Sequence, residues 1–86
     1  MGDSKGEGMA MKELVLYIAK ALVDNPDKVE VTEISGEKAT VIELKVAEGD
    51  RGKIIGKEGR IIKSIRTIVN SASAKMDKRA TVEIIE

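Results

Sequence analysis

Two glycines three residues apart, Gly56 and Gly59, bracket the segment of this chain whose residue types are best suited to binding an anion. Glycine permits a positive φ angle or a close approach of another molecule, so the pair predicts a sharp turn. A helix is expected to begin directly after it, with unpaired backbone N–H groups at the positive end of its dipole. Lys57 and Arg60 add positive charge, whereas Glu58 is acidic. The segment therefore predicts an anion-binding loop.

The residues just before the loop predict a smooth apolar surface leading to it. Gly52, Ile55 and Gly56 are three or four positions apart, so they share one face of a short helix. Ile54 is expected to point toward the core instead. The alternative is that Ile55 is also a core residue.

Charge is distributed unevenly along the chain, although its formal net value is zero. Residues 1–50 carry 6 basic and 11 acidic side chains, a net of −5, and residues 51–86 carry 9 basic and 4 acidic, a net of +5. A local patch of this kind attracts phosphate even when the total charge is zero. The basic residues around the predicted loop are Arg51, Lys53, Lys57, Arg60, Lys63 and Arg66.

Composition excludes several kinds of catalytic and metal site. The sequence has no cysteine and no histidine, so disulfides, thiolate metal sites and histidine-dependent nucleophiles are impossible. No recognisable motif places a carboxylate pair against an apolar pocket. We therefore expect no enzymatic activity, no cofactor and no metal. The absence of a long apolar run and of a signal peptide predicts a cytoplasmic protein without a membrane partner.

The elements that must position the loop follow from the spacing of apolar residues. The polar, Gly-rich residues 1–10 predict a disordered tail or an expression remnant, and residues 11–86 predict one domain. The predicted elements are a helix at 11–24, strands at 28–34 and 39–47, a short helix at 51–55, a long helix at 60–76 and a strand at 79–85. The order α-β-β-α-α-β predicts an α+β fold with a three-stranded sheet covered on one face by three helices.

Three local details accompany this assignment. The first helix is expected to bury Leu14, Val15, Ile18, Ala21 and Leu22 and to end at Asn25-Pro26. Asp50 is predicted to cap the short helix. In the long helix, Lys63, Arg66 and Asn70 are expected opposite the apolar stripe.

Two rival interpretations of the glycines are weaker. A P-loop requires four residues between its glycines and Ser or Thr after the lysine, but Gly52 and Gly56 are one residue too close and Glu58 follows Lys57. A helix-turn-helix for duplex DNA needs polar base-reading side chains on its second helix, and the strands favour a sheet-backed fold. The remaining alternative is a helix–helix corner without a ligand.

The run Gly52-Lys53-Ile54-Ile55-Gly56-Lys57-Glu58-Gly59-Arg60 resembles the signature of KH domains, whose G-x-x-G loop lies between two helices and contacts four nucleotides. The element order resembles the bacterial type II KH fold. The run from Arg60 to Val69 is similar to the small single-KH proteins of bacteria, the KhpA or YlqC-like family.

The resemblance implies binding of single-stranded RNA with low sequence specificity, as an RNA chaperone or post-transcriptional regulator. The loop would hold phosphates, Gly52 and Ile55 would form an apolar wall supported by Ile62, and the edge of the strand around Ile42–Val46 would face the bases. The candidate RNA-binding residues are Gly52, Lys53, Ile55, Gly56, Lys57, Glu58, Gly59, Arg60, Ile62 and Lys63.

The resemblance also implies homodimers and possible heterodimers with a larger multi-domain KH protein of the Jag type. Two surfaces are candidates for a dimer contact: Val15, Tyr17 and Val23 of the first helix, or the apolar face from Ile61 to Met76. The alternative function is a protein-interaction module whose basic face is incidental.

Overall fold

A computed structural model describes residues 11–85 of the chain, so the predicted tail at residues 1–10 lies outside the described residues. The helices and strands are α2 (Met11–Leu22), β1 (Glu30–Ser35), β2 (Thr40–Lys45), α3 (Arg51–Ile55), α4 (Arg60–Ala74) and β3 (Ala80–Ile84). Short 3-10 turns occur at η1 (Pro26–Lys28), η2 (Glu48–Asp50) and η3 (Lys57–Gly59). The predicted order α-β-β-α-α-β is confirmed. Within residues 11–85, no helix is both long and apolar enough to cross a membrane.

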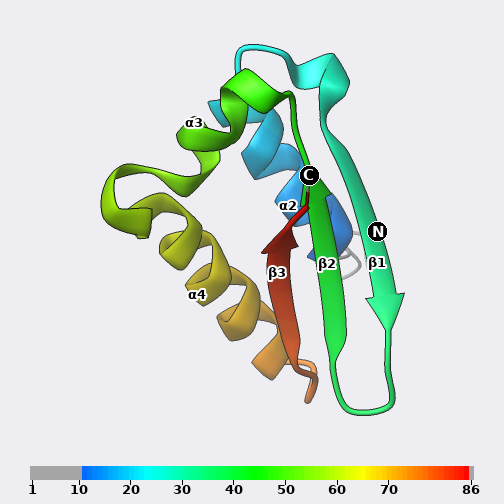
Figure 1. Cartoon of the computed structure of the whole chain (residues 1–86). Coiled ribbons are helices and arrows are strands. Elements are labelled where there is room, and N and C mark those ends of the chain that lie inside the picture. The colour runs from blue at the N-terminus through cyan, green and yellow to red at the C-terminus, as the bar shows by residue number, and fades with distance from the viewer. Residues whose placement is uncertain (1–10, 86) are drawn as a thin grey trace, which may run out of the picture.

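The sheet is mixed and has the strand order β1-β2-β3 (Figure 1). β1 pairs with β2 antiparallel, from Glu30 opposite Lys45 to Ser35 opposite Thr40, and β2 pairs with β3 in parallel. In β2, Ile42 and Leu44 are fully buried, whereas the alternating Lys45 is exposed. The three helices pack on the face that buries Ile42 and Leu44, and no helix within residues 11–85 covers the opposite face.

The core is aliphatic, as the composition requires, but α2 is rotated relative to the prediction. Val15 and Ala19 are completely buried and Val23 nearly so, four residues apart in each step. Leu22, which was predicted to be buried, is exposed, and so is Ala21. Because α2 carries apolar residues on most of its circumference, its sequence pattern does not determine which stripe faces the sheet.

α4 ends in a hydrogen-bonded cap that was not predicted from the sequence. The backbone N–H of Asp77 donates to the Ala74 carbonyl at 3.1 Å, and that of Lys78 donates to the Ser73 carbonyl at 3.0 Å. Asp77 itself has a positive φ of 57°. This is the Schellman arrangement, with aspartate at the left-handed position that glycine usually takes. The cap turns the chain back toward β3.

Candidate nucleic-acid interface

The loop between α3 and α4 turns through three residues with positive φ angles. Gly56 has φ 77° and ψ 173°, Glu58 has φ 58° and ψ 25°, and Gly59 has φ 74° and ψ 17°. The predicted positive φ angles of both glycines are confirmed. The N–H of Gly59 donates to the Gly56 carbonyl at 3.1 Å and closes the turn. The loop projects to the side of the molecule, away from the sheet (Figure 1).

The N-terminus of α4 differs from the prediction in one respect. The backbone N–H of Arg60 is not free, because it donates to the Lys57 carbonyl within the η3 turn. No side chain caps this helix end. The positive end of the helix dipole therefore lies directly under the loop without a compensating side-chain acceptor.

The helix before the loop presents the predicted apolar face. A Cβ added at Gly52 would meet no heavy atom within 4 Å, so this glycine leaves open space above the helix. Ile55 is 38% exposed, which excludes the alternative that it is a core residue. Ile54 is fully buried, as predicted. Ile62 is also buried and lies under this region rather than on its surface.

The cations that the sequence groups together have different environments in the structure. Lys57 and Lys63 are exposed, and the side-chain ammonium of neither has a hydrogen bond or ion pair with any residue in 11–85. The Lys53 ammonium lies 3.3 Å from the Asp24 carboxylate, and the Arg60 guanidinium lies 3.2 Å from the Glu58 carboxylate.

The predicted position of Arg66 was wrong. It was expected on the solvent side of the long helix, but it is partly buried and its Nε donates to the Val82 carbonyl at 3.0 Å. The guanidinium therefore links α4 to β3. We remove Arg66 from the cations expected to be available to a phosphate.

The strand nearest α4 is β3, and this corrects the predicted role of β2. β2 is the central strand, and from Thr40 to Leu44 it is paired on both sides, so it has no free edge to offer. At the two ends of β3, the Arg79 carbonyl accepts from the Thr40 N–H and the Ile85 N–H donates to the Leu44 carbonyl, both of β2. Because backbone groups alternate in direction along a parallel strand, those of Ala80, Val82 and Ile84 face the outer edge.

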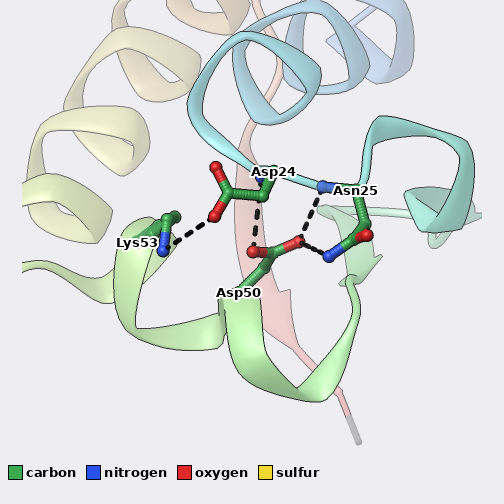
Figure 2. A network of polar contacts seen from close by, with 4 residues as sticks. All are labelled: Asp24, Asn25, Asp50 and Lys53. Carbon is green, nitrogen blue, oxygen red and sulfur yellow. Dashed lines mark hydrogen bonds and ion pairs between the residues drawn. The ribbon is translucent and has the colours of Figure 1, made fainter.

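A buried carboxylate joins the start of α3 to the end of α2 (Figure 2). Asp50 is 2% exposed, and its Oδ2 accepts hydrogen bonds from the Asn25 backbone N–H and the Asn25 side-chain amide, both at 3.0 Å. Its Oδ1 accepts the backbone N–H of Asp24 at 3.3 Å. Asp50 was predicted to cap α3, but its side chain makes no capping hydrogen bond. Its role is instead to fasten two segments about 25 residues apart in sequence.

The same contacts determine how Asp50 titrates. Burial by itself raises the pKa of a carboxyl group, but the hydrogen bonds from Asn25 and Asp24, together with the charge of Lys53, outweigh burial and lower the pKa of Asp50. A carboxylate with a lowered pKa stabilises the fold above its unfolded pKa, and this contribution disappears as the pH falls through the folded pKa.

We predict that Asp50→Asn lowers the melting temperature at neutral pH, because an amide cannot accept from all three donors. The difference between this variant and the wild type should begin to shrink as the pH falls below about 4, the pKa of an unfolded aspartate, and should go on shrinking as the pH falls through the lowered pKa of the folded Asp50. Thermal melts followed by circular dichroism between pH 7 and pH 3 measure it. Asp27→Asn at an exposed position is the control, and equal melting of the two variants at pH 7 would contradict the prediction.

Asp24, Asn25 and Asp50 were absent from the candidate RNA-binding residues chosen from the sequence. Their hydrogen bonds and the Asp24–Lys53 ion pair join positions separated by 25 to 29 residues, so no local spacing reveals them. The only sequence signal was that Asn25-Pro26 ends a helix and Asp50 begins one, which marks both as helix boundaries.

Residues 12–84 match the sequence model of the family described as KhpA/KhpB, KH domain. The chain belongs to this family. Its α+β architecture with a mixed three-stranded sheet is the type II KH fold.

Curated KhpA/KhpB-family relatives cover the same region. The RNA-binding protein KhpA of Caldanaerobacter subterraneus subsp. tengcongensis is 63% identical over 75 residues, covering 87% of this chain and 100% of the relative. The RNA-binding protein KhpA of Clostridium acetobutylicum is 56% identical with the same coverage, and that of Aquifex aeolicus is 53% identical over 90% of this chain and 98% of the relative.

Solved structures share the fold at low sequence identity. Era, in a crystal structure with MgGDPNP and nucleotides 1506–1542 of 16S ribosomal RNA, matches 86% of this chain with a TM-score of 0.62 and 23% identity. Era of Aquifex aeolicus, in a GDP.AlF4- complex, matches 98% of this chain with a TM-score of 0.60 and 21% identity. This chain covers 28% and 35% of those two chains, so the likeness is to one part of each.

Proposed function

We propose that this KH-domain protein binds single-stranded RNA across the Gly56–Gly59 loop and the exposed face of α3, and that it is not an enzyme. The observation that carries the proposal is the loop itself: two glycines with positive φ, an uncapped helix N-terminus below them and the unpaired Lys57 at the tip. The relatives named RNA-binding protein KhpA support RNA as the ligand.

Each part of the surface has a separate task. The loop backbone, Lys57 and Lys63 hold phosphates, because these cations need not leave a protein partner first. Gly52 and Ile55 give a base an apolar surface against which to lie. The outer edge of β3, in place of β2, offers backbone groups to base edges, except for the Val82 carbonyl, which accepts from Arg66.

Low sequence specificity follows from what the chain lacks. It has no Phe and no Trp, and its single aromatic residue, Tyr17, is in α2. Stacking on aromatic side chains is a usual source of affinity in single-strand binders. Recognition then rests on phosphates, apolar contact and a few base-edge hydrogen bonds, which suits an RNA chaperone or a broad post-transcriptional regulator.

We also propose a two-fold dimer that leaves the loop accessible. Val15 and Val23 were predicted as possible dimer-contact residues. They are buried in the core of the monomer, which excludes them from a dimer contact. Tyr17 on α2 is 71% exposed and Ile68 on α4, beside the buried Val69, is 46% exposed, so each of the two predicted surfaces keeps an exposed apolar side chain. Two linked RNA surfaces would raise the affinity without a new contact. The family description joins KhpA with KhpB, which keeps a larger KH protein of the Jag type as an alternative partner.

A titration with mixed-sequence single-stranded RNA, with duplex RNA of equal length as the competitor, tests the function. We expect binding to the single strand with a preference over the duplex, because a flat loop-and-helix surface needs unstacked bases. Light scattering on the same samples reports whether the 9.3 kDa chain is doubled in mass. Equal affinity for both RNAs would contradict the single-strand proposal. No binding to either would favour the alternative of a protein-interaction module.

A further inference from the structure

One of the cations near the loop is paired with a residue far away in the sequence. Lys53 is on α3, the same short helix that bears Gly52 and Ile55, and its ammonium lies 3.3 Å from the carboxylate of Asp24. Asp24 follows the end of α2, 29 residues earlier in the chain. The side chains are 45% and 75% exposed, so both are accessible to an arriving ligand.

The position of Asp24 is held by a buried group rather than by its own side chain. The backbone N–H of Asp24 donates to Asp50, and the neighbouring Asn25 makes two further hydrogen bonds to the same carboxylate. Asp50 directly precedes α3. The segment that carries Asp24 is therefore held against the start of the helix that carries Lys53. Figure 2 shows the hydrogen bonds to Asp50 beside the ion pair between Asp24 and Lys53.

This arrangement places a negative charge where an RNA phosphate would approach α3. A carboxylate beside an ammonium cancels much of its field, and it repels a phosphate that comes to the same site. Lys57 and Lys63 have no such partner among residues 11–85. Arg60 has Glu58, but that pair is between near neighbours in sequence, on an exposed loop.

We propose that Asp24 competes with RNA phosphate for Lys53 and thereby limits the affinity of the α3 surface. The inference rests on the proposed RNA binding. In this role Asp24 lowers the affinity for RNA, whereas a residue that positioned Lys53 for RNA would raise it. The anchored backbone of the Asp24–Asn25 segment keeps the competing carboxylate in place while leaving its side chain free to release the lysine.

The test compares Asp24→Asn with the wild type in titrations with one mixed-sequence single-stranded RNA at two salt concentrations. The substitution keeps the backbone N–H that Asp50 accepts and removes only the charge. We expect the affinity to rise about two- to fivefold, the range of one exposed ion pair. The slope of log K against log salt should steepen by about 0.7, which corresponds to one additional phosphate contact on a single strand.

Asp27→Asn is the matched control, because it makes the same change of charge three residues away. Asp27 is exposed and forms no ion pair with any described residue. Equal gains from Asp24→Asn and Asp27→Asn would overturn the inference and point to net charge alone. A loss of affinity in Asp24→Asn would also overturn it, because Asp24 would then be positioning Lys53 for RNA.

A double-mutant cycle with Lys53→Met gives an independent readout. Lys53→Met should reduce affinity less in the wild type than in the Asp24→Asn background, where the lysine is released. Equal reductions in both backgrounds would overturn the competition. The wild-type titration separates this inference from the proposed function: if the wild type binds no RNA, the function fails and the inference with it, whereas wild-type binding with no coupling between the two residues overturns the inference alone.

Discussion

Replacing Lys57 and Glu58 together with aspartate is expected to reduce RNA affinity at least about tenfold, or about 1.4 kcal/mol, while the fold remains intact. The Lys57 side chain is exposed and has no hydrogen-bond or ion-pair partner within residues 11–85, so its replacement breaks no such internal contact. Aspartate tolerates the left-handed conformation found at Glu58. A reversed charge at the loop tip would repel the phosphates that the loop is proposed to hold.

The same RNA titration and a thermal melt measure both halves of this prediction. Lys38→Asp, in the exposed turn between β1 and β2, makes the same reversal of charge far from the loop in Figure 1. An equal loss of affinity in the control would show that bulk charge matters and the loop does not. Unchanged affinity in the double variant would remove the loop from the RNA surface.

The architecture was predictable because several segments have a strict apolar period. β2 alternates between buried and more exposed residues from Ile42 to Lys45, and α4 buries Ile62, Ile65 and Val69 at helical spacing. The loop conformation was predictable as well, since two glycines at this spacing leave few alternatives to a turn with positive φ.

Contacts between distant segments were not predictable from local patterns. The rotation of α2 depends on which of several apolar stripes fits the sheet, and Ala19 at a fully buried position has no strong hydrophobic signal of its own. The partners of Asp50 and Lys53 come from the turn after α2. Local helix-capping rules led to the wrong partner for Asp50, because a carboxylate next to a helix start need not cap that helix.

The role of β2 could not be read from the strand pattern either. Its hydrophobic alternation indicates one buried face but does not say which edges are paired. Only the parallel addition of β3 beside β2 shows that β2 is central and that Val82 lies on the outer strand. Arg66 illustrates the same limit: its helical position indicated a solvent-facing cation, whereas the free carbonyl of Val82 accepts its Nε–H.

Gly56→Ala is expected to destabilise the fold by about 2–6 kcal/mol. At φ 77° and ψ 173°, Gly56 occupies a region that is almost restricted to glycine, and an alanine there costs about 1–3 kcal/mol in strain. The added Cβ would also meet Ile61 Cγ1 at 2.5 Å and Ile61 Cβ at 2.9 Å. Overpacking of this kind costs a further 1–3 kcal/mol or so. In a domain of this size, each kcal/mol lowers the melting temperature by about 4–8 °C.

The other two glycines of this region provide matched controls for Gly56→Ala. Gly59 has a positive φ, but an added Cβ would be 4.0 Å from its nearest neighbours, so Gly59→Ala should cost only the left-handed strain of about 1–2 kcal/mol. Gly52 lies within α3 with open space around it, so Gly52→Ala should be neutral or stabilise by up to about 1 kcal/mol. Chemical denaturation of the three variants gives the order. Equal destabilisation by Gly56→Ala and Gly59→Ala would show that Ile61 yields easily and that backbone strain alone governs the loop.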